Sequence, residues 1–317
     1  MTDPNMLTAG IDTAKNKLDL AVHGSPIRLT CDNRPAGWRG LAHELGRLGV
    51  RRIGIEATGG YERGVVGHLR RAGFSVLVLQ PLQTKAFARL HLRRAKNDAI
   101  DAALIAACTA LVDPPDIQPD HRLADLADHL TFVDQIQKDI ARAKVRREHV
   151  HDARLLRMID ADITRLEKRS ATEIERIAKA IEAHDDLARR LKLVLSVPGI
   201  GLKTAIAILV RMPEIGRITR EQAAALAGLA PFDDDSGERK GQRHIAGGRS
   251  RLRRALYAAA LPAAFRWNAA LIQLYQRLIA RGKKHQQALV ACARKLIVFA
   301  NAVVQRNAPW ATDQQPT

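Results

Sequence analysis

Apolar and polar residues follow two different periods in the first third of the chain. Five short apolar runs have the length and the turn-rich borders of strands: 7–11, 18–22, 27–31, 51–57 and 74–81. Four other segments carry apolar side chains at the spacing of helices: 37–50, 61–73, 82–92 and 98–111. The sequence therefore predicts the order β-β-β-α-β-α-β-α-α, which is typical of an α/β domain with a mixed sheet.

The pattern breaks at residues 113–120, where DPPDIQPD places three prolines and three aspartates within eight residues. From His121 to Lys192 the chain contains no glycine or proline. Six apolar residues in this stretch approximate a seven-residue repeat: Ile159, Ile163, Leu166, Ile174, Ile177 and Ile181. The repeat predicts a helical hairpin or a coiled coil that joins two chains, with two ordinary packed helices as the alternative.

These patterns divide the chain into three predicted parts: a mixed-sheet domain (1–115), a helical coiled-coil connection (116–192) and a helix-rich domain (193–317). In the third part, SVPGIG at 196–201 joins two predicted helices. This segment resembles a helix-hairpin-helix turn, whose glycine amides hold a DNA phosphate without reading sequence. Gly199, Gly201 and Lys203 are therefore predicted to contact nucleic acid, and a plain corner between two helices is the alternative.

The excess of positive charge indicates the kind of partner that the protein binds. The 317 residues include 51 Lys and Arg against 33 Asp and Glu, a net charge of +18. Between Arg239 and Thr312 there are 15 Lys or Arg and no Asp or Glu, whereas an ordinary solvated face mixes both signs. This tract predicts binding to a nucleic-acid backbone. The predicted contacts are Arg239, Lys240, Arg243, Arg249, Arg251, Arg253 and Arg254.

Other features exclude several classes of protein. The three cysteines are far apart and match neither a disulfide framework nor a zinc site. No secretion signal and no apolar run of membrane-spanning length is recognisable, so the sequence predicts a cytoplasmic protein without a membrane partner. With 3 Trp, 3 Tyr and 6 Phe, the chain is a poor candidate for a surface that stacks on single-stranded bases.

Four carboxylates stand out in the first part. Asp12 ends the first predicted strand and Glu56 ends the fourth. Asp98 and Asp101 share one face of the helix predicted at 98–111. Because the ends of adjacent strands converge, these acids are expected to meet, and their mutual repulsion favours a hard divalent cation between them. The set predicts a Mg²⁺ site, with Mn²⁺ able to substitute. Taken singly, each acid is more often a turn former or a helix cap.

Ser236 lies between three aspartates and the basic tract. The DSG sequence is a turn signal, so the hydroxyl is expected on an exposed loop, close to cations that could neutralise a phosphate. Ser236 is therefore a candidate nucleophile, although most loop serines are only turn residues.

The segment GIDTAKNKLDLAV allows another interpretation, because it resembles the phosphate loop of actin-like ATPases. Ala14 and Lys15 stand where that loop needs glycine, and this disfavours ATP.

Five ordered segments carry a resemblance to a known family: AGIDTAKNKLDLAV, GIEATGGYE, KNDAIDAALIA, SVPGIGLKTAIAIL and PFDDDSGERKGQRHIAGGRSRLRRALYAAAL. Over residues 7–305 the chain resembles the DEDD-type transposases of IS110 insertion sequences, and within them the IS1111 branch. The resemblance implies a RuvC-like (RNase H-like) domain, a coiled-coil connection and a C-terminal transposase domain. It places the family's acidic tetrad on Asp12, Glu56, Asp98 and Asp101, and its catalytic serine on Ser236.

The resemblance also implies partners and a reaction. Members of this family are recombinases that move a circularised element, guided by a structured non-coding RNA (bridge RNA or seekRNA) that pairs with donor and target double-stranded DNA. Their dimers assemble into tetramers, in which the acidic domain of one protomer meets the serine domain of another. Ser236 would then attack a DNA phosphate, assisted by Mg²⁺ at the tetrad. Two alternatives remain: a Mg²⁺-dependent nuclease similar to Holliday-junction resolvases, and a non-enzymatic nucleic-acid scaffold.

Overall fold

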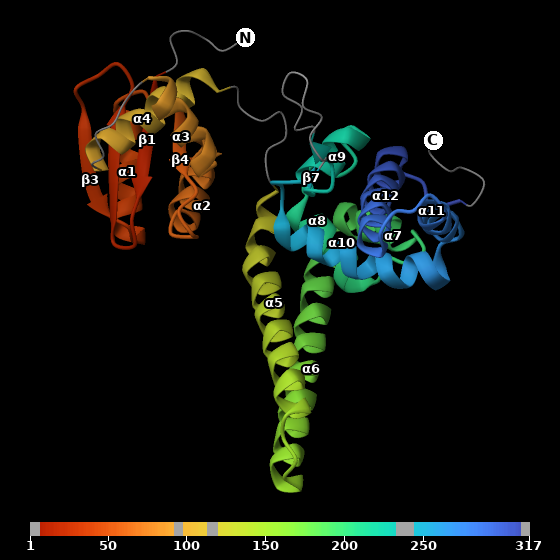
Figure 1. Cartoon of the computed structure of the whole chain (residues 1–317). Helices are drawn as coiled ribbons and strands as arrows, with labels where there is room; N and C mark the ends of the chain where they lie inside the picture. The colour runs from red at the N-terminus through yellow and green to blue at the C-terminus, as the bar shows by residue number, and fades with distance from the viewer. Residues whose placement is uncertain (1–6, 92–97, 113–119, 233–243, 312–317) are drawn as a thin grey trace. The chain divides into compact units, whose positions relative to one another are not determined.

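The computed structural model describes residues 7–91, 98–112, 120–232 and 244–311 of the chain (Figure 1). The chain forms two compact units, Met1–Gln118 and Pro119–Thr317. The second unit contains both the predicted helical connection and the predicted helix-rich domain. The finer division into three domains stays a prediction.

A mixed sheet of five strands forms the centre of the described part of the N-terminal unit. Its strands are β1 (Thr8–Thr13), β2 (Lys17–Val22), β3 (Arg28–Asp32), β4 (Arg52–Glu56) and β5 (Ser75–Leu79). They lie in the order β3-β2-β1-β4-β5. The pairs of β1 with β2 and of β2 with β3 are antiparallel, whereas β1 with β4 and β4 with β5 are parallel.

The helices of this unit follow in the predicted order. They are α1 (Pro35–Arg47), α2 (Arg63–Arg71), α3 (Pro81–Leu90) and α4 (Asp98–Leu111). The predicted order of strands and helices is thus confirmed, and a mixed sheet with these helices is consistent with an RNase H-like α/β fold. The predicted break at residues 113–120 lies almost wholly outside the described residues.

The two faces of the sheet differ because side chains alternate along a strand. Ile11, Ile53 and Ile55 point to one face, where they join a buried cluster with Leu45 of α1 and Leu69 of α2. The opposite face of β1 and β4 carries much smaller residues, Gly10 and Gly54, at the same level of the sheet. The alternation therefore leaves room for a helix to approach the second face closely.

Helix α4 occupies this room and crosses β1 and β4 (Figure 1). A Cβ atom on Gly10 would lie 2.2 Å from the backbone nitrogen of Ala106 and 2.3 Å from the carbonyl oxygen of Ala102. A Cβ atom on Gly54 would lie 1.7 Å from Oγ1 of Thr109. The backbone of α4 is thus in direct contact with β1, and only glycine at position 10 permits this contact.

The contact between α4 and β1 can be tested by Gly10→Ala. The added methyl group would displace the α4 backbone, so we expect the free energy of unfolding of the N-terminal unit to fall by about 3 kcal/mol. Gly40→Ala is the matched control, because position 40 lies in α1 with open space around it; this change should stabilise the unit by about 0.5–1 kcal/mol. Chemical denaturation would measure both. Equal stability of Gly10→Ala and the wild-type chain would contradict the close contact.

A long antiparallel pair of helices begins the C-terminal unit (Figure 1). These are α5 (His121–Glu148) and α6 (Ala153–Glu182), which begin after the capping residues Asp120 and Asp152. Three residues of the apolar repeat predicted on α6, Ile159, Ile163 and Leu166, pack together with Ile136 and Ile140 of α5 in the same chain. The predicted helical hairpin is confirmed. Dimerisation through a coiled coil stays a prediction.

The remaining described elements of this unit are mostly helical. They are α7 (Asp185–Leu195), α8 (Leu202–Arg211), α9 (Arg220–Leu226), β6 (Pro231–Phe232), β7 (His244–Ile245), α10 (Ser250–Pro262), the π-helix η1 (Ala263–Trp267), α11 (Ala269–Ala280) and α12 (His285–Arg306). Helix α12 runs through the core and buries Leu289, Leu296 and Ala300.

Among the described helices only α12 is long and apolar enough to cross a membrane, and most of its apolar stretch is buried in this unit. The sequence predicts no such run because Arg294 and Lys295 lie within this stretch, and α12 corrects that prediction.

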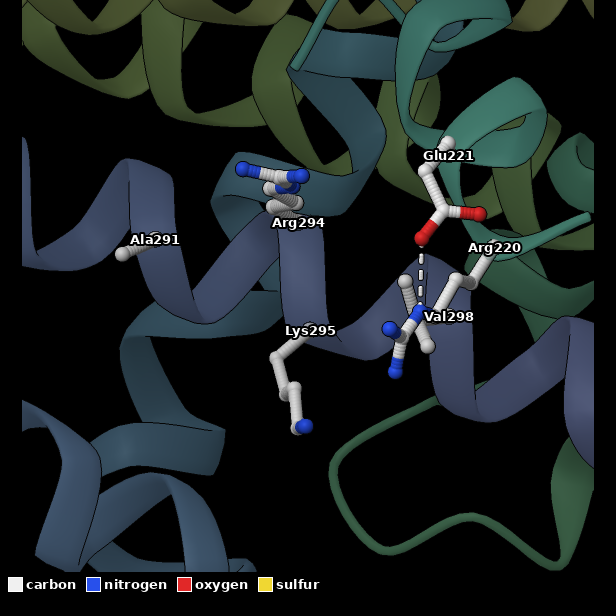
Figure 2. Close-up of a pocket in the computed structure, with 6 residues that line it drawn as sticks. All are labelled: Arg220, Glu221, Ala291, Arg294, Lys295 and Val298. Atoms are coloured by element: carbon white, nitrogen blue, oxygen red, sulfur yellow. Dashed lines mark hydrogen bonds and ion pairs between the residues drawn. The ribbon is translucent and has the colours of Figure 1, made fainter. Parts of the chain in front are cut away.

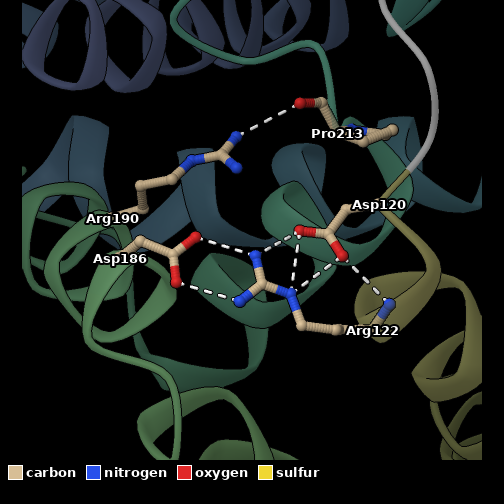
Figure 3. Close-up of polar contacts among 5 residues, drawn as sticks. All are labelled: Asp120, Arg122, Asp186, Arg190 and Pro213. Atoms are coloured by element: carbon tan, nitrogen blue, oxygen red, sulfur yellow. Dashed lines mark hydrogen bonds and ion pairs between the residues drawn. The ribbon is translucent and has the colours of Figure 1, made fainter.

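Arg122 ties the start of α5 to the start of α7 (Figure 3). Its guanidinium binds Asp120, with Nη2 2.7 Å from Oδ2, and it also binds both carboxylate oxygens of Asp186, at 3.0 and 2.8 Å. The hydrogen bond from Arg122 lowers the pKa of Asp186 below its ordinary value. Nearby, Arg190 of α7 donates to the carbonyl oxygens of Pro213 and Ile215, both at 3.2 Å. These contacts hold the base of the hairpin against the helical body.

The link through Arg122 predicts a pH-dependent change in stability. Since the pKa of Asp186 is lower in the folded chain, the stabilisation is complete above its unfolded pKa, near pH 4, and is lost as the pH falls through the folded value. Arg122→Gln should therefore lower the free energy of unfolding by about 1 kcal/mol at pH 7, and the deficit should shrink below about pH 4. Thermal unfolding from pH 7 to pH 3 would measure it.

Arg142→Gln is the control, because Arg142 forms an exposed pair with Asp139 at 3.4 Å. Its effect should stay below about 0.5 kcal/mol at every pH. A deficit in Arg122→Gln that did not depend on pH would refute the assigned ion pair.

Candidate active site and nucleic-acid interface

Asp12 and Glu56 lie side by side at the carboxyl ends of two parallel strands. The register pairs Ile11 of β1 with Ile55 of β4, so the next residues, Asp12 and Glu56, are lateral neighbours. Adjacent strands are separated by about 4.8 Å. Both acids share the parity of Gly10 and Gly54, so their side chains point to the face that α4 covers. The structure thus brings two of the four predicted acids together.

Each of these carboxylates has a defined hydrogen bond. Oε2 of Glu56 accepts from the hydroxyl of Thr84 in α3 at 2.5 Å, and Thr84 is almost completely buried. Oδ1 of Asp12 accepts from the backbone N–H of Thr13 at 2.9 Å. Asp19, directly opposite Asp12 on β2, is engaged by Lys17 and by the hydroxyl of Thr30, both at 2.8 Å. The sequence analysis missed Thr84, since no local motif links it to a strand 28 residues away.

The loops that follow β1 and β4 are fastened to each other by Asn33. Its side-chain amide donates to the carbonyl oxygen of Ala14 at 2.9 Å and to that of Tyr61 at 3.0 Å. Its carbonyl oxygen accepts from the indole of Trp38 in α1 at 2.9 Å. Asn33 was also missed by the sequence analysis, although it holds the edge of the sheet at which Asp12 and Glu56 lie.

Glu62 closes the loop after β4. Its Oε2 accepts the backbone N–H groups of Thr58 and Gly60 at 3.1 and 2.9 Å. The segment GIEATGGYE contains both this residue and Glu56. The sequence signal for Glu62 was therefore present in a segment already singled out, but its role in the loop could be seen only in the structure.

The two acids of α4 complete the predicted set only in part. Asp101 precedes Ala102, which contacts β1, so the first turn of α4 lies beside that strand. Asp98 begins α4, but its side chain is not among those that the structure describes. Within the described part of the chain, no group of three or more His, Cys, Asp or Glu side chains is arranged to hold a metal ion. Carboxylate oxygens are the donors that Mg²⁺ prefers, so the donor chemistry fits, and the complete tetrad stays a prediction.

Ser236, Arg239, Lys240 and Arg243 all lie outside the described residues. The backbone on either side of them is paired, because Phe232 of β6 lies opposite His244 of β7 in an antiparallel ribbon. The segment that carries Ser236 therefore starts and ends at the same place in the C-terminal unit. The role of Ser236 stays a prediction.

The SVPGIG turn connects α7 and α8 as the sequence predicts. Gly199 adopts a φ of +95°, and a Cβ atom there would lie 2.3 Å from Cβ of Ala263 in η1. Asn268 donates to the carbonyl oxygen of Pro198 at 3.1 Å, and the backbone N–H of Trp310 donates to Oγ of Ser196 at 2.8 Å. Packing therefore explains Gly199 by itself, and phosphate binding by Gly199 and Gly201 stays a prediction.

Two arginines of the predicted basic tract make contacts within the unit. Arg249 forms two hydrogen bonds with the carboxylate of Glu214, at 2.6 and 2.8 Å. Burial tends to raise the pKa of Glu214, but Arg249 holds it below its ordinary value. Arg253 donates to the carbonyl oxygens of Gly228 and Gly247 at 3.1 and 2.8 Å. Both side chains thus have structural roles, and their predicted contacts with nucleic acid remain untested.

A cluster of cations surrounds Asp134 of α5. Arg211 of α8 lies 2.8 Å from its Oδ2, and Arg251 of α10 lies 3.8 Å away. Lys203 of α8 is also near Asp134. Partial burial lowers the pKa of its ammonium group, and the charge of Asp134 offsets this only in part. Arg254 also acts on Arg211 through charge repulsion. One carboxylate therefore faces several cations drawn from two helices, and such a surplus of positive charge suits a phosphate partner.

Two family models that describe transposases match different parts of the chain. A family model described as a DEDD transposase of the IS110 type matches residues 9–158, and one described as the transposase IS116/IS110/IS902 family matches residues 191–276. The chain is 28% identical over 314 residues to the "Pilin gene-inverting protein" of Moraxella bovis, covering 95% of this chain and 96% of that protein. The protein of the same name from Moraxella lacunata has the same identity and coverage. An uncharacterised IS110 protein of Streptomyces coelicolor is 37% identical over 142 residues, which are 44% of this chain and 33% of that protein.

Proposed function

The chain belongs to the IS110 family of DEDD transposases, which are DNA recombination enzymes, and on that premise we propose that it exchanges DNA strands through a covalent link between Ser236 and a DNA phosphate. A structured guide RNA (bridge RNA or seekRNA) selects the donor and target DNA. The N-terminal unit acts as a RuvC-like catalytic domain. The chains work as dimers that assemble into tetramers in the cytoplasm.

One observation of the structure supports this proposal most strongly. Asp12 and Glu56 occupy neighbouring positions on one face of the sheet, at the carboxyl ends of β1 and β4, with the first turn of α4 beside β1. Two adjacent carboxylates repel each other, so such a pair is more stable with a cation between them. The edge of the sheet is therefore suited to phosphodiester chemistry.

The acids of the N-terminal unit would bind the metal ion, and two polar residues near them would hold them in position. Asp12, Glu56, Asp98 and Asp101 would hold Mg²⁺, which when bound supplies positive charge at the reacting phosphate. Thr84 fixes the orientation of Glu56, and Asn33 holds the neighbouring loops. These contacts restrict the motion of the acids before DNA arrives, which is how an active site is preorganised.

Ser236 carries the covalent step. Its Oγ forms a bond to phosphorus and one P–O bond of the DNA backbone breaks. The serine proton passes to a base, and the departing DNA oxygen takes up a proton from a general acid or from water and becomes a hydroxyl. That hydroxyl later loses its proton and attacks the phosphorus joined to Ser236 on another strand; the P–Oγ bond breaks and the serine oxygen takes up a proton. One phosphoester bond replaces another at every step, so the exchange needs no ATP.

The names of the relatives favour this reaction over hydrolysis. The Moraxella proteins are named for inverting a pilin gene. Inversion requires cut ends to be rejoined in the other orientation, and an enzyme that hydrolyses the backbone with water discards the bond energy that rejoining needs. A Mg²⁺-dependent nuclease similar to Holliday-junction resolvases is the second candidate, because the paired acids alone would serve it.

Substitution of Ser236 separates these two candidates. Ser236→Ala should abolish strand exchange and remove any protein–DNA adduct that survives denaturation, a loss of at least about 10³-fold. Asp12→Asn should also abolish adduct formation. Denaturing gels with labelled DNA, the guide RNA and Mg²⁺ would measure both.

Ser250→Ala is the control, because this exposed serine begins α10 and takes no part in the proposed step. It should form the adduct at the wild-type rate. Full strand cleavage by Ser236→Ala without any adduct would establish the nuclease instead.

A further inference from the structure

Two loops lie at the edge of the sheet where the paired acids of β1 and β4 are found. The first loop, residues 14–16, follows β1, and the second, residues 57–62, follows β4. Because these two strands are parallel, both loops leave the sheet at the same edge. We call the two loops together the rim. The rim exposes the side chain of Lys15 and the ring of Tyr61, a residue that is 51% exposed.

The second loop of the rim is held by its own hydrogen bonds. The hydroxyl of Thr58 donates to the carbonyl oxygen of Glu56 at 3.1 Å. Glu62, which is almost completely buried, accepts from the backbone N–H groups of Thr58 and Gly60. Gly59 and Gly60 adopt φ values of +70° and +111°, which favour glycine. The backbone that carries Tyr61 is therefore fixed relative to Glu56.

Asn33 joins the second loop to the first. One nitrogen, Nδ2, donates to the carbonyl oxygens of both Ala14 and Tyr61, so these two carbonyl groups lie next to each other. Asn33 is held in turn by the indole of Trp38. That indole packs closely on α2, since a Cβ atom on Gly64 would lie 2.3 Å from Cη2 of Trp38. The two loops thus form one rim with a fixed spacing.

The hollow between α9 and α12 shows a different use of polar contacts (Figure 2). There the guanidinium of Arg220 and the carboxylate of Glu221 bind each other at 2.6 Å, and no residue that lines the hollow is aromatic. In the rim, the hydrogen bonds hold the backbone and leave the ring of Tyr61 half exposed. A single exposed apolar group needs no explanation, but this ring is held beside two carboxylates that favour a cation and a phosphate.

The two exposed side chains of the rim match the chemistry of a DNA strand at this place. A strand whose phosphate lies at the paired acids continues across the rim on either side of that phosphate. A tyrosine ring offers a large flat contact to a base or a sugar and has few rotamers to lose. A lysine ammonium binds a backbone phosphate. The first contact requires a nucleotide, whereas the second is satisfied by its charge alone.

We propose that the rim holds the DNA strand at the reacting phosphate, with the ring of Tyr61 packed against the adjacent nucleotide and the ammonium of Lys15 on a neighbouring phosphate. The inference rests on the proposed function for the place of the reacting phosphate. Both side chains contact the substrate and take no part in the transfer of the phosphate. A single ring serves one nucleotide and is not a platform for a longer single strand.

The contact is tested by combining Lys15→Gln with Tyr61→Ala in the full-length chain. The probe is a duplex DNA in which 5-iodouracil replaces thymine, with the guide RNA present. In the wild-type chain we expect light to join this DNA to the peptide that contains Tyr61, as detected by mass spectrometry. In the double variant, affinity for the DNA should fall about tenfold at 100 mM salt. The slope of log affinity against log salt should fall by about 0.9.

The matched control is Leu7→Ala with Arg51→Gln. Both residues are exposed and lie at the opposite edge of the same sheet, before β1 and β4. The control therefore removes one apolar group and one cation from the same unit. Its affinity for the DNA should change by less than about twofold, as a general change in net charge predicts.

Two single variants separate the ring from the phenol hydroxyl. Tyr61→Phe keeps the ring and should form the Ser236 adduct within about twofold of the wild-type rate, whereas Tyr61→Ala should be slower by about tenfold. Both should keep the wild-type affinity for Mn²⁺ and the wild-type free energy of unfolding, because the ring is exposed. An equal loss of rate in both variants would show that the ring is not the contact, and this would overturn the inference.

The remaining outcomes separate the rim from the covalent chemistry. Crosslinking and affinity do not depend on strand exchange, so they decide the role of the rim even if the wild-type chain forms no Ser236 adduct. If the adduct forms, but the rim variant and the opposite-edge control bind DNA equally well and no crosslink reaches Tyr61, the inference is overturned and the covalent chemistry stands.

Discussion

The contact between the backbone of α4 and strand β1 is the constraint on which the candidate active site depends. Gly10 and Gly54 leave no side chain on the face that α4 crosses, so Ala102 and Ala106 reach the sheet directly. The same alternation that makes room for the helix points Asp12 and Glu56 to its face of the sheet. A bulkier residue at position 10 would therefore disturb both the packing of the unit and the placement of Asp101 relative to the strand acids.

In the C-terminal unit, single carboxylates bind arginines that come from other parts of the chain or from the adjacent position. Glu214 binds Arg249, Asp134 binds Arg211 and lies near Arg251, and Glu221 binds Arg220. Each of these acids binds one arginine, and further cations lie close to Asp134. Asp134 and Glu214 thus link separate segments of the unit, and binding of a nucleic acid by the neighbouring cations stays a prediction.

Much of the fold follows from local patterns in the sequence. The short apolar runs predicted the five strands of the N-terminal sheet in order, and the stretch without glycine or proline predicted the hairpin. Contacts between distant residues were not predictable in this way. Thr84 and Asn33 act across folds of the chain, and Gly10 carries no sign in the sequence that a helix lies against it. Likewise, the basic tract suggested phosphate contacts for Arg249 and Arg253, whose partners in the structure are Glu214 and two carbonyl groups.

The central claim is that Asp12 and Glu56 jointly hold a divalent cation, and calorimetric titration of Mn²⁺ into the full-length chain tests it most directly. The account predicts saturable binding that Asp12→Asn and Glu56→Gln each weaken at least about tenfold, because each removes a charged oxygen ligand. Asp32→Asn should leave binding unchanged, since that carboxylate lies at the end of β3 and pairs with Arg34 at 2.6 Å. Binding of wild-type strength in both acid variants would contradict the account.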